Sequence, residues 1–203
     1  METKTKSNIV RGVNIILRPW LDTDAETLYR LASDPDVGTR AGWAPHRSVE
    51  ESLSVIRDVF RNDTTWAIVL PDNDGTPVGA IGYGPSCDCN LPALPDEPTV
   101  GYWVGKPFWN RGICTEALRT MIAQIREQNA RCLAIRAAGH IENHLPLQEQ
   151  HLIPSLISGH YVDNPASGRV MEKCGFVPTG DICYDPALYG DPARPIRVLR
   201  LRL

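Results

Sequence analysis

A strand pattern that passes through a glycine turn into an amphipathic helix most restricts the possible folds of this chain. The strand pattern is TVGYWV, residues 99–104, and the helix pattern lies within KPFWNRGICTEALRTMIAQI, residues 106–125. Apolar residues recur in it at helical spacing: Cys114, Ala117, Leu118, Met121, Ile122 and Ile125. This spacing places them on one face, so the helix is expected to pack on a core.

The start of this predicted helix has no short polar side chain next to its first turn. The first N–H groups of a helix lack partners within it, and Arg111, Gly112 and Ile113 offer no short oxygen group. Gly112 has no Cβ, so a ligand can approach its backbone closely. A bare helix N-terminus after a glycine turn is typical of a phosphate or pyrophosphate site. The alternative, equally compatible with these residues, is that Asn110 caps the helix and Gly112 eases a turn.

Two common nucleotide-binding motifs do not fit this turn. The tripeptide GKP at residues 105–107 lacks the hydroxyl residue and the upstream glycines of a P-loop. No G-x-G-x-x-G follows the strand, so a dinucleotide fingerprint is also excluded.

The remaining patterns alternate between strand and helix, which predicts one mixed α/β sheet. Capping boxes at Thr23 and Ser48 are expected to begin two helices, and Asn164 followed by Pro165 a third. Residues 33–47 are expected to form a loop. Strand patterns lie at 15–20, 65–70, 77–83, 99–104, 131–138, 177–184 and 196–203. Residues 139–162 have no clear period, and we interpret them as an insertion within a single domain, 1–203.

Composition limits the possible partners. The net charge is -3 with no basic run, so neither a nucleic-acid surface nor an anionic membrane surface is expected. The longest apolar runs have the length of strands, so no membrane span is expected. METKTKSNIV does not resemble a signal peptide, so we expect a cytoplasmic protein with reduced thiols. Cys87 and Cys89 lie in a predicted loop, where they could bind metal or oxidise, although their spacing is uncommon for zinc.

Two motifs in sequence order identify a family resemblance. GYWVGKPFWNRGICTEAL, residues 101–118, followed by NPASGRVMEKCGF, residues 164–176, resembles the GCN5-related N-acetyltransferase (GNAT) superfamily. ILRPW and the openings of the first two helices are similar to its RimJ/RimL-like ribosomal-protein N-acetyltransferase branch. The resemblance implies an α/β fold whose twisted mixed sheet has six to seven strands and about four helices. Its fourth and fifth strands are expected to splay around acetyl-CoA, with no metal.

The resemblance also implies positions for acetyl-CoA. The pyrophosphate is expected on the turn from Trp109 to Cys114, the pantetheine arm along Trp103 to Gly105, and the thioester near Asn164 and Ser167. The full set of implied cofactor residues is Trp103, Val104, Gly105, Trp109, Asn110, Arg111, Gly112, Ile113, Cys114, Thr115, Asn164, Ser167 and Lys173.

The resemblance implies catalytic roles less directly than it implies cofactor positions. Ser167 is expected to donate a proton to the departing thiolate, with a helix-start hydrogen bond as the structural alternative. Thr99 stands where relatives often carry a glutamate base, so the candidates for the base are Glu97, His46 or a water chain. Trp43, His46 and Tyr102 are expected to line the acceptor pocket.

The resemblance leaves several functions open. The acceptor is expected to be a primary amine, on a protein N-terminus, a peptide or a small molecule. A homodimer is one oligomeric state that the resemblance allows, since dimers are common in this branch. The alternatives are a non-catalytic module that senses acetyl-CoA and an acyltransferase with a longer acyl donor. The segment 139–162 is expected to form a surface flap over the acceptor side. Its histidines, His140, His144, His151 and His160, allow a zinc cluster as the alternative.

Overall fold

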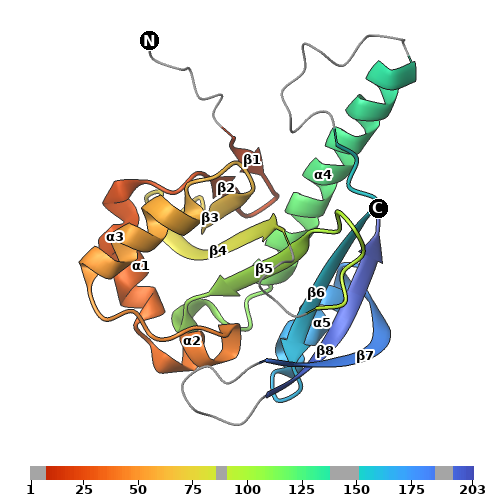
Figure 1. Ribbon diagram of the computed structural model, residues 1–203. Helices are drawn as coiled ribbons and strands as arrows, with labels where there is room; N and C mark the ends of the chain where they lie inside the picture. The colour runs from red at the N-terminus through yellow and green to blue at the C-terminus, as the bar shows by residue number, and fades with distance from the viewer. Residues whose placement is uncertain (1–7, 86–90, 138–150, 186–193) are drawn as a thin grey trace.

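The structure is a computed structural model that describes residues 8–85, 91–137, 151–185 and 194–203. It contains a sheet of eight strands in the order β1-β2-β3-β4-β5-β6-β8-β7 (Figure 1). The strands are β1 (Val10–Arg11), β2 (Ile16–Arg18), β3 (Thr65–Val69), β4 (Pro77–Gly84), β5 (Thr99–Val104), β6 (Ser155–Tyr161), β7 (Val177–Asp185) and β8 (Arg194–Arg202). The helices are α1 (Ala25–Ala32), α2 (Pro35–Ala41), α3 (Val49–Val55), α4 (Ile113–Ala137) and α5 (Pro165–Lys173). The mixed α/β fold expected from the sequence is confirmed.

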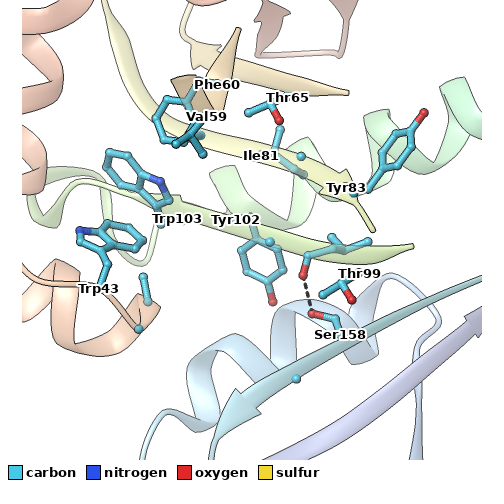
Figure 2. A pocket seen from close by; sticks show the side chains of 18 of the residues that line it. Trp43, Val59, Phe60, Thr65, Ile81, Tyr83, Thr99, Tyr102, Trp103 and Ser158 are labelled. Carbon is cyan, nitrogen blue, oxygen red and sulfur yellow. Dashed lines mark hydrogen bonds between the residues drawn. The ribbon is translucent and has the colours of Figure 1, made fainter. Parts of the chain in front are cut away.

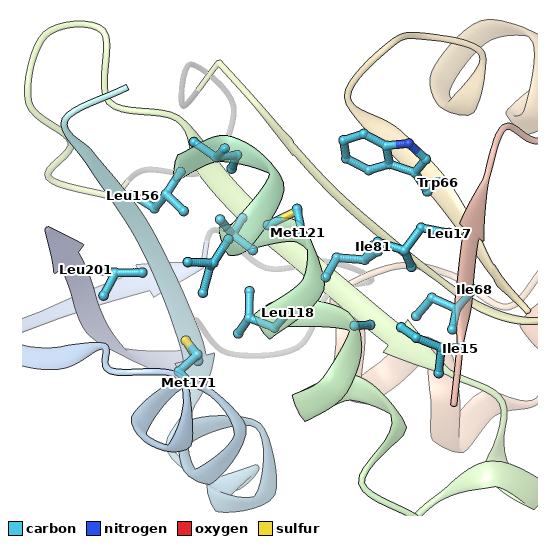
Figure 3. Packing of buried hydrophobic residues seen from close by; sticks show 14 of the residues in the cluster. Ile15, Leu17, Trp66, Ile68, Ile81, Leu118, Met121, Leu156, Met171 and Leu201 are labelled. Atoms are coloured by element: carbon cyan, nitrogen blue, oxygen red, sulfur yellow. The ribbon is translucent and has the colours of Figure 1, made fainter. Parts of the chain in front are cut away.

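Side chains alternate between the two faces of the sheet, as the pleat requires. On β4, Ile81 packs in the main cluster with α4, whereas Ala80 packs in a second cluster with α1 and α3. The main cluster fills the space between the sheet and the helices α4 and α5 (Figure 3). Its fully buried members include Ile15, Leu17, Ile68, Ile81, Leu118, Met121, Leu156 and Met171.

The sheet divides at β5 and β6, which are the splayed pair. These two strands are parallel, and their paired register holds one residue pair, Thr99 with Ile157. The amide of Ile157 donates to the carbonyl of Pro98 at 3.0 Å, and Ser158 Oγ donates to the carbonyl of Val100 at 2.9 Å. Beyond these contacts the two strands pair no further. The expected splay between the fourth and fifth strands is therefore confirmed, but the additional edge strand β1 shifts their labels to β5 and β6, and the fifth strand is Ser155–Tyr161 rather than residues 131–138.

Three expectations about elements are wrong. RCLAIRAA, predicted as a strand, continues α4 as far as Ala137. The predicted loop at 33–47 contains α2, whose start is capped by the side chain of Asp34 and whose end has Gly42 at a φ of 89°. The segment 139–162 contains the central strand β6, so the flap interpretation fails for residues 155–161. His140 and His144 lie outside the described residues, as do Cys87 and Cys89.

The predicted caps had mixed outcomes. Ser48 caps α3 by accepting from the amide of Glu51 at 3.1 Å, as expected. Thr23 does not cap α1, because residues 22–24 form a 3-10 turn before that helix. Asp24 instead accepts from the amide of Leu21 at 2.9 Å.

Candidate active site

Two hydroxyl groups meet from opposite sides of the splay. Tyr102 lies on β5 and Ser167 lies in the first turn of α5. Tyr102 Oη donates to the carbonyl of Ser167 at 2.8 Å and lies 3.1 Å from Ser167 Oγ. Burial raises the pKa of the Tyr102 phenol above its ordinary value, so the group keeps its proton at neutral pH. The pair therefore holds its hydroxyl protons at the point where the sheet opens.

Asn164 fixes the position of Ser167. Its side-chain oxygen accepts from the amide of Ser167 at 3.4 Å, and Pro165 follows at the first helical position. The Asn164 amide group also donates to the carbonyl of Arg40 at 3.3 Å, which ties α5 to α2. Lys173 is exposed at the opposite end of α5, where its carbonyl accepts from Arg119 at 2.9 Å. The structure thus brings Asn164 and Ser167 together at the start of α5, whereas Lys173 lies away from them at the other end.

The turn before α4 has an open, left-handed backbone. Asn110 has a φ of 60° and Gly112 a φ of 76°, and a Cβ added to Gly112 would meet nothing within 4 Å. Among the described residues, the Asn110 side chain has no hydrogen bond, so the structure does not support it as the helix cap. The first-turn amide groups, which include those of Ile113, Cys114 and Thr115, therefore have no side-chain cap.

Two guanidinium groups flank this turn. Arg111 lies over the ring of Phe108 at 5.7 Å and Arg40 lies over the ring of Trp109 at 5.2 Å. Their charges add to the positive end of the helix dipole. Burial raises the pKa of the Cys114 thiol to about 12, so this cysteine is a neutral apolar residue on the same helix. The arrangement is a positive, accessible helix start of the kind that binds anions.

Within the described residues, the edge of β5 that faces β6 keeps some backbone groups unpaired. The carbonyl of Val100 points toward β6, because it accepts from Ser158. Alternate residues of a strand direct their backbone groups to the same side, so those of Tyr102 and Val104 face the splay as well. The Trp109 indole donates to the carbonyl of Val104 at 2.9 Å, and the amide of Gly105 donates to the carbonyl of Val78 at 2.9 Å. An extended ligand can pair with the remaining groups of Tyr102 and Val104.

A cleft of 1260 Å³ opens on the face of the sheet that carries α1 and α3. Figure 2 shows Trp43 and Trp103 together near one end of the cleft and Thr99 near Ser158 at the other, with Tyr102 between. Trp43 and Trp103 make an edge-to-face contact with ring centroids 5.2 Å apart. The lining includes Trp43, His46 and Tyr102, the three residues expected to line an acceptor pocket, and it reaches Ser167.

His46 presents an unprotonated nitrogen in its neutral form. Its Nδ1 lies 2.8 Å from Ser52 Oγ, and that hydroxyl donates to the carbonyl of Ser48 at 3.2 Å. Ser52 therefore accepts from Nδ1–H, which leaves Nε2 without a proton. Burial lowers the pKa of His46, although the nearby Glu51 charge opposes this effect. His46 is accordingly a neutral proton acceptor near pH 7.

Glu97 is not placed to act as the base. Its carboxylate is paired with Arg200 at 2.8 Å and also accepts from the amide of Leu94 at 3.0 Å. Burial alone would raise the pKa of Glu97, but hydrogen bonds from Arg200, Leu94 and Ser155, with the Arg200 charge, together lower it. Glu97 is outside the cleft lining. Thr99 does line the cleft, but its hydroxyl is buried without a partner among the described residues.

Sequence reasoning missed several lining residues. Gly101, Tyr83, His160 and Tyr161 border the cleft. For Gly101, the period of two along TVGYWV was the available signal, because it places Thr99, Gly101 and Trp103 on the face of the strand opposite Tyr102. His160 Nδ1 lies 2.8 Å from the carbonyl of Tyr161, so this nitrogen carries the proton.

Among the described residues, no group of three or more His, Cys, Asp or Glu could hold a metal ion. No helix in this part of the chain is long and apolar enough to cross a membrane.

Comparison with known proteins fits this geometry. The acetyltransferase (GNAT) domain family matches residues 14–177. The chain belongs to the GNAT acetyltransferase family. No curated protein sequence matches the chain at a significant level.

Solved GNAT structures share the fold over nearly the whole chain. RimL, a ribosomal L7/L12 alpha-N-protein acetyltransferase in complex with coenzyme A, is 16% identical with a TM-score of 0.69, covering 96% of this chain and 98% of its own. A GNAT acetyltransferase from Bacillus anthracis is 14% identical with a TM-score of 0.66, covering 96% and 98%. The microcin C7 self-immunity acetyltransferase MccE, in complex with acetyl-CoA and AMP, is 17% identical with a TM-score of 0.65, covering 94% and 93%.

Proposed function

We propose that this GNAT protein transfers an acetyl group from acetyl-CoA directly to a primary amine. The observation that carries the proposal is the Tyr102–Ser167 hydroxyl pair, which lies at the splay and lines the cleft. The coenzyme A bound to RimL and the acetyl-CoA bound to MccE support this donor. The likeness to RimL also supports a place in the RimJ/RimL-like branch.

The residues present fit acetyl-CoA. Arg40, Arg111 and the uncapped start of α4 would hold the pyrophosphate. The backbone amide and carbonyl of Tyr102 and the amide of Val104 would pair with the pantetheine arm. When bound, acetyl-CoA supplies an activated acetyl thioester close to the hydroxyl pair.

The chain's own residues would then carry out the proton transfers of the reaction. His46, directly or through water, takes a proton from the acceptor ammonium, so that the amine nitrogen has a lone pair. The nitrogen forms a bond to the acetyl carbon as the bond from that carbon to sulfur breaks. The Tyr102–Ser167 pair donates a proton to the leaving sulfur. The acylated nitrogen gives up its second proton, which restores the pair directly or through water. The products are a neutral amide and coenzyme A, and His46 releases the proton that it took to solvent.

The test is acetylation of a panel of primary amines and peptides, followed by mass spectrometry. We expect acetylated product to accumulate in step with free coenzyme A. If acetyl-CoA binds but no panel member is acetylated above the rate without protein, the proposal fails in favour of a sensing module. Comparison of acetyl-, propionyl- and butyryl-CoA tests the donor, and a preference for a longer chain would overturn the acetyl assignment.

A further inference from the structure

The floor of the cleft is made of small residues. They project from neighbouring strands on the face that carries α1 and α3; they are Thr65, Ala80, Gly82, Gly84, Thr99 and Gly101. A Cβ added to Gly84 or to Gly101 would meet nothing within 4 Å, and neither glycine has a positive φ. The backbone therefore does not require glycine at these positions, and its effect is to leave a flat open surface over β4 and β5.

The walls around this floor are apolar and aromatic. Trp43 and Trp103 stand together near one end, with Val59 and Phe60 above (Figure 2). Val59 is 57% exposed, although it faces a cleft in which other apolar groups gather. Aromatic walls above a flat floor favour a planar apolar group, because stacked and edge-to-face contacts add to the burial of its area.

Acidic side chains are scarce among the described residues that line the cleft. Glu51 is the one acidic residue in its described lining. Its carboxylate accepts from the amide of Arg47 at 2.6 Å and lies 3.5 Å from the Arg47 guanidinium. Within the described lining, a polyamine, an aminoglycoside or a lysine-rich peptide would therefore find one carboxylate, which Arg47 already pairs, for its several positive charges.

We infer that the acceptor is a small monoamine with a planar aromatic body, an inference that rests on the proposed function. The ring lies on the floor of small residues, beside Trp43 and Trp103. The amine points to the splay, toward Tyr102 and Ser167. Gly101 determines this specificity, because a side chain there would fill the surface on which the ring rests.

The test compares kcat/KM for 2-phenylethylamine, spermidine and a peptide with an N-terminal serine. We expect 2-phenylethylamine to exceed both of the others by at least about tenfold. Gly101→Leu should lower its kcat/KM by at least about tenfold, while acetyl-CoA binding changes by less than about twofold. A preference for spermidine or the peptide, or unchanged kinetics in Gly101→Leu, would overturn the inference.

Matched measurements separate this inference from the proposed function. Val177→Leu adds bulk at a strand position that is 65% exposed and outside the cleft, so it should leave both amine and acetyl-CoA parameters unchanged. Calorimetric titration of 2-phenylethylamine into the coenzyme-A-loaded protein reads the acceptor site without turnover. Binding that Gly101→Leu abolishes would support the acceptor class even if no amine were acetylated, and absence of binding would reject it.

Discussion

At the scale of single residues, successive side chains of β5 point to opposite faces of the sheet and so contact different parts of the site. Tyr102 contacts Ser167 at the splay, whereas Gly101 and Trp103 lie on the opposite face of β5, toward the floor of the cleft. Ser167 and Asn164 were expected near the thioester from the family motif. The contact between Tyr102 and Ser167 was not expected, because the two residues are 65 positions apart and no local pattern reports such a distance.

Loss of either hydroxyl should slow the chemical step. We expect Ser167→Ala and Tyr102→Phe each to lower kcat by about 10²-fold, a typical contribution of general acid catalysis, with acetyl-CoA affinity little changed. The measurement is steady-state kinetics beside acetyl-CoA titration. Tyr29→Phe, on α1 and outside the cleft, is the matched control and should keep full activity. Full turnover in Ser167→Ala would leave Tyr102 as the donor, and full turnover in both variants would contradict the assignment.

At the scale of elements, the errors of sequence reasoning have physical causes. RCLAIRAA contains a continuous apolar run, CLAI, of the length of a strand, yet Cys132 continues the helical stripe of Leu118 and Ile125. β6 was missed because SLISGHY is buried along most of its length and so shows no alternation. By contrast, the first half of α4 and the start of α5 were predicted correctly, because periodicity and capping residues are local signals.

The continuation of α4 makes Asn129 structurally important. Its side chain donates to the carbonyl of Ile153 at 2.8 Å and accepts from the amide of Ile153 at 3.0 Å, just before β6. Asn129→Ala removes both bonds and should lower the free energy of unfolding by about 1–2 kcal/mol. Urea denaturation measures this loss. Arg126→Ala, at an exposed position of the same helix, should change stability by less than about 0.5 kcal/mol. Equal effects of the two variants would refute this role for Asn129.

At the scale of the whole molecule, two groups of strands meet at the closed end of the splay. The carboxylate of Glu97 contributes there, because it pairs with Arg200 of β8 from the segment just before β5. The Glu97 side chain is 1% exposed and that of Arg200 is 23% exposed, so the pair lies largely out of water. From the sequence, Glu97 was a candidate base because it lies close to Thr99. Its position in the sequence could not reveal its partner, Arg200, which is 103 positions away.

Removal of this charge should destabilise the fold in a pH-dependent way. Glu97→Gln leaves Arg200 partly buried without its carboxylate, so the loss should be about 2–3 kcal/mol at pH 7. Because the folded-state pKa of Glu97 is lowered, the contribution is present above its unfolded pKa and is lost as pH falls through the folded pKa. The difference between wild type and variant in urea denaturation should therefore shrink in acid. Glu127→Gln, which breaks an exposed pair with Arg131, should cost less than about 1 kcal/mol. A loss at Glu97 that did not shrink in acid would contradict this account.

The central claim is that the open start of α4 holds the pyrophosphate of acetyl-CoA. Calorimetric titration with acetyl-CoA tests it, comparing wild type with Gly112→Asp and Gly112→Asn. Both variants place a Cβ at a φ of 76°, but only the aspartate places a negative charge there. We predict that wild type binds and that Gly112→Asp binds at least about tenfold more weakly than Gly112→Asn. Absence of binding by wild type, or equal weakening in the two variants, would contradict the claim.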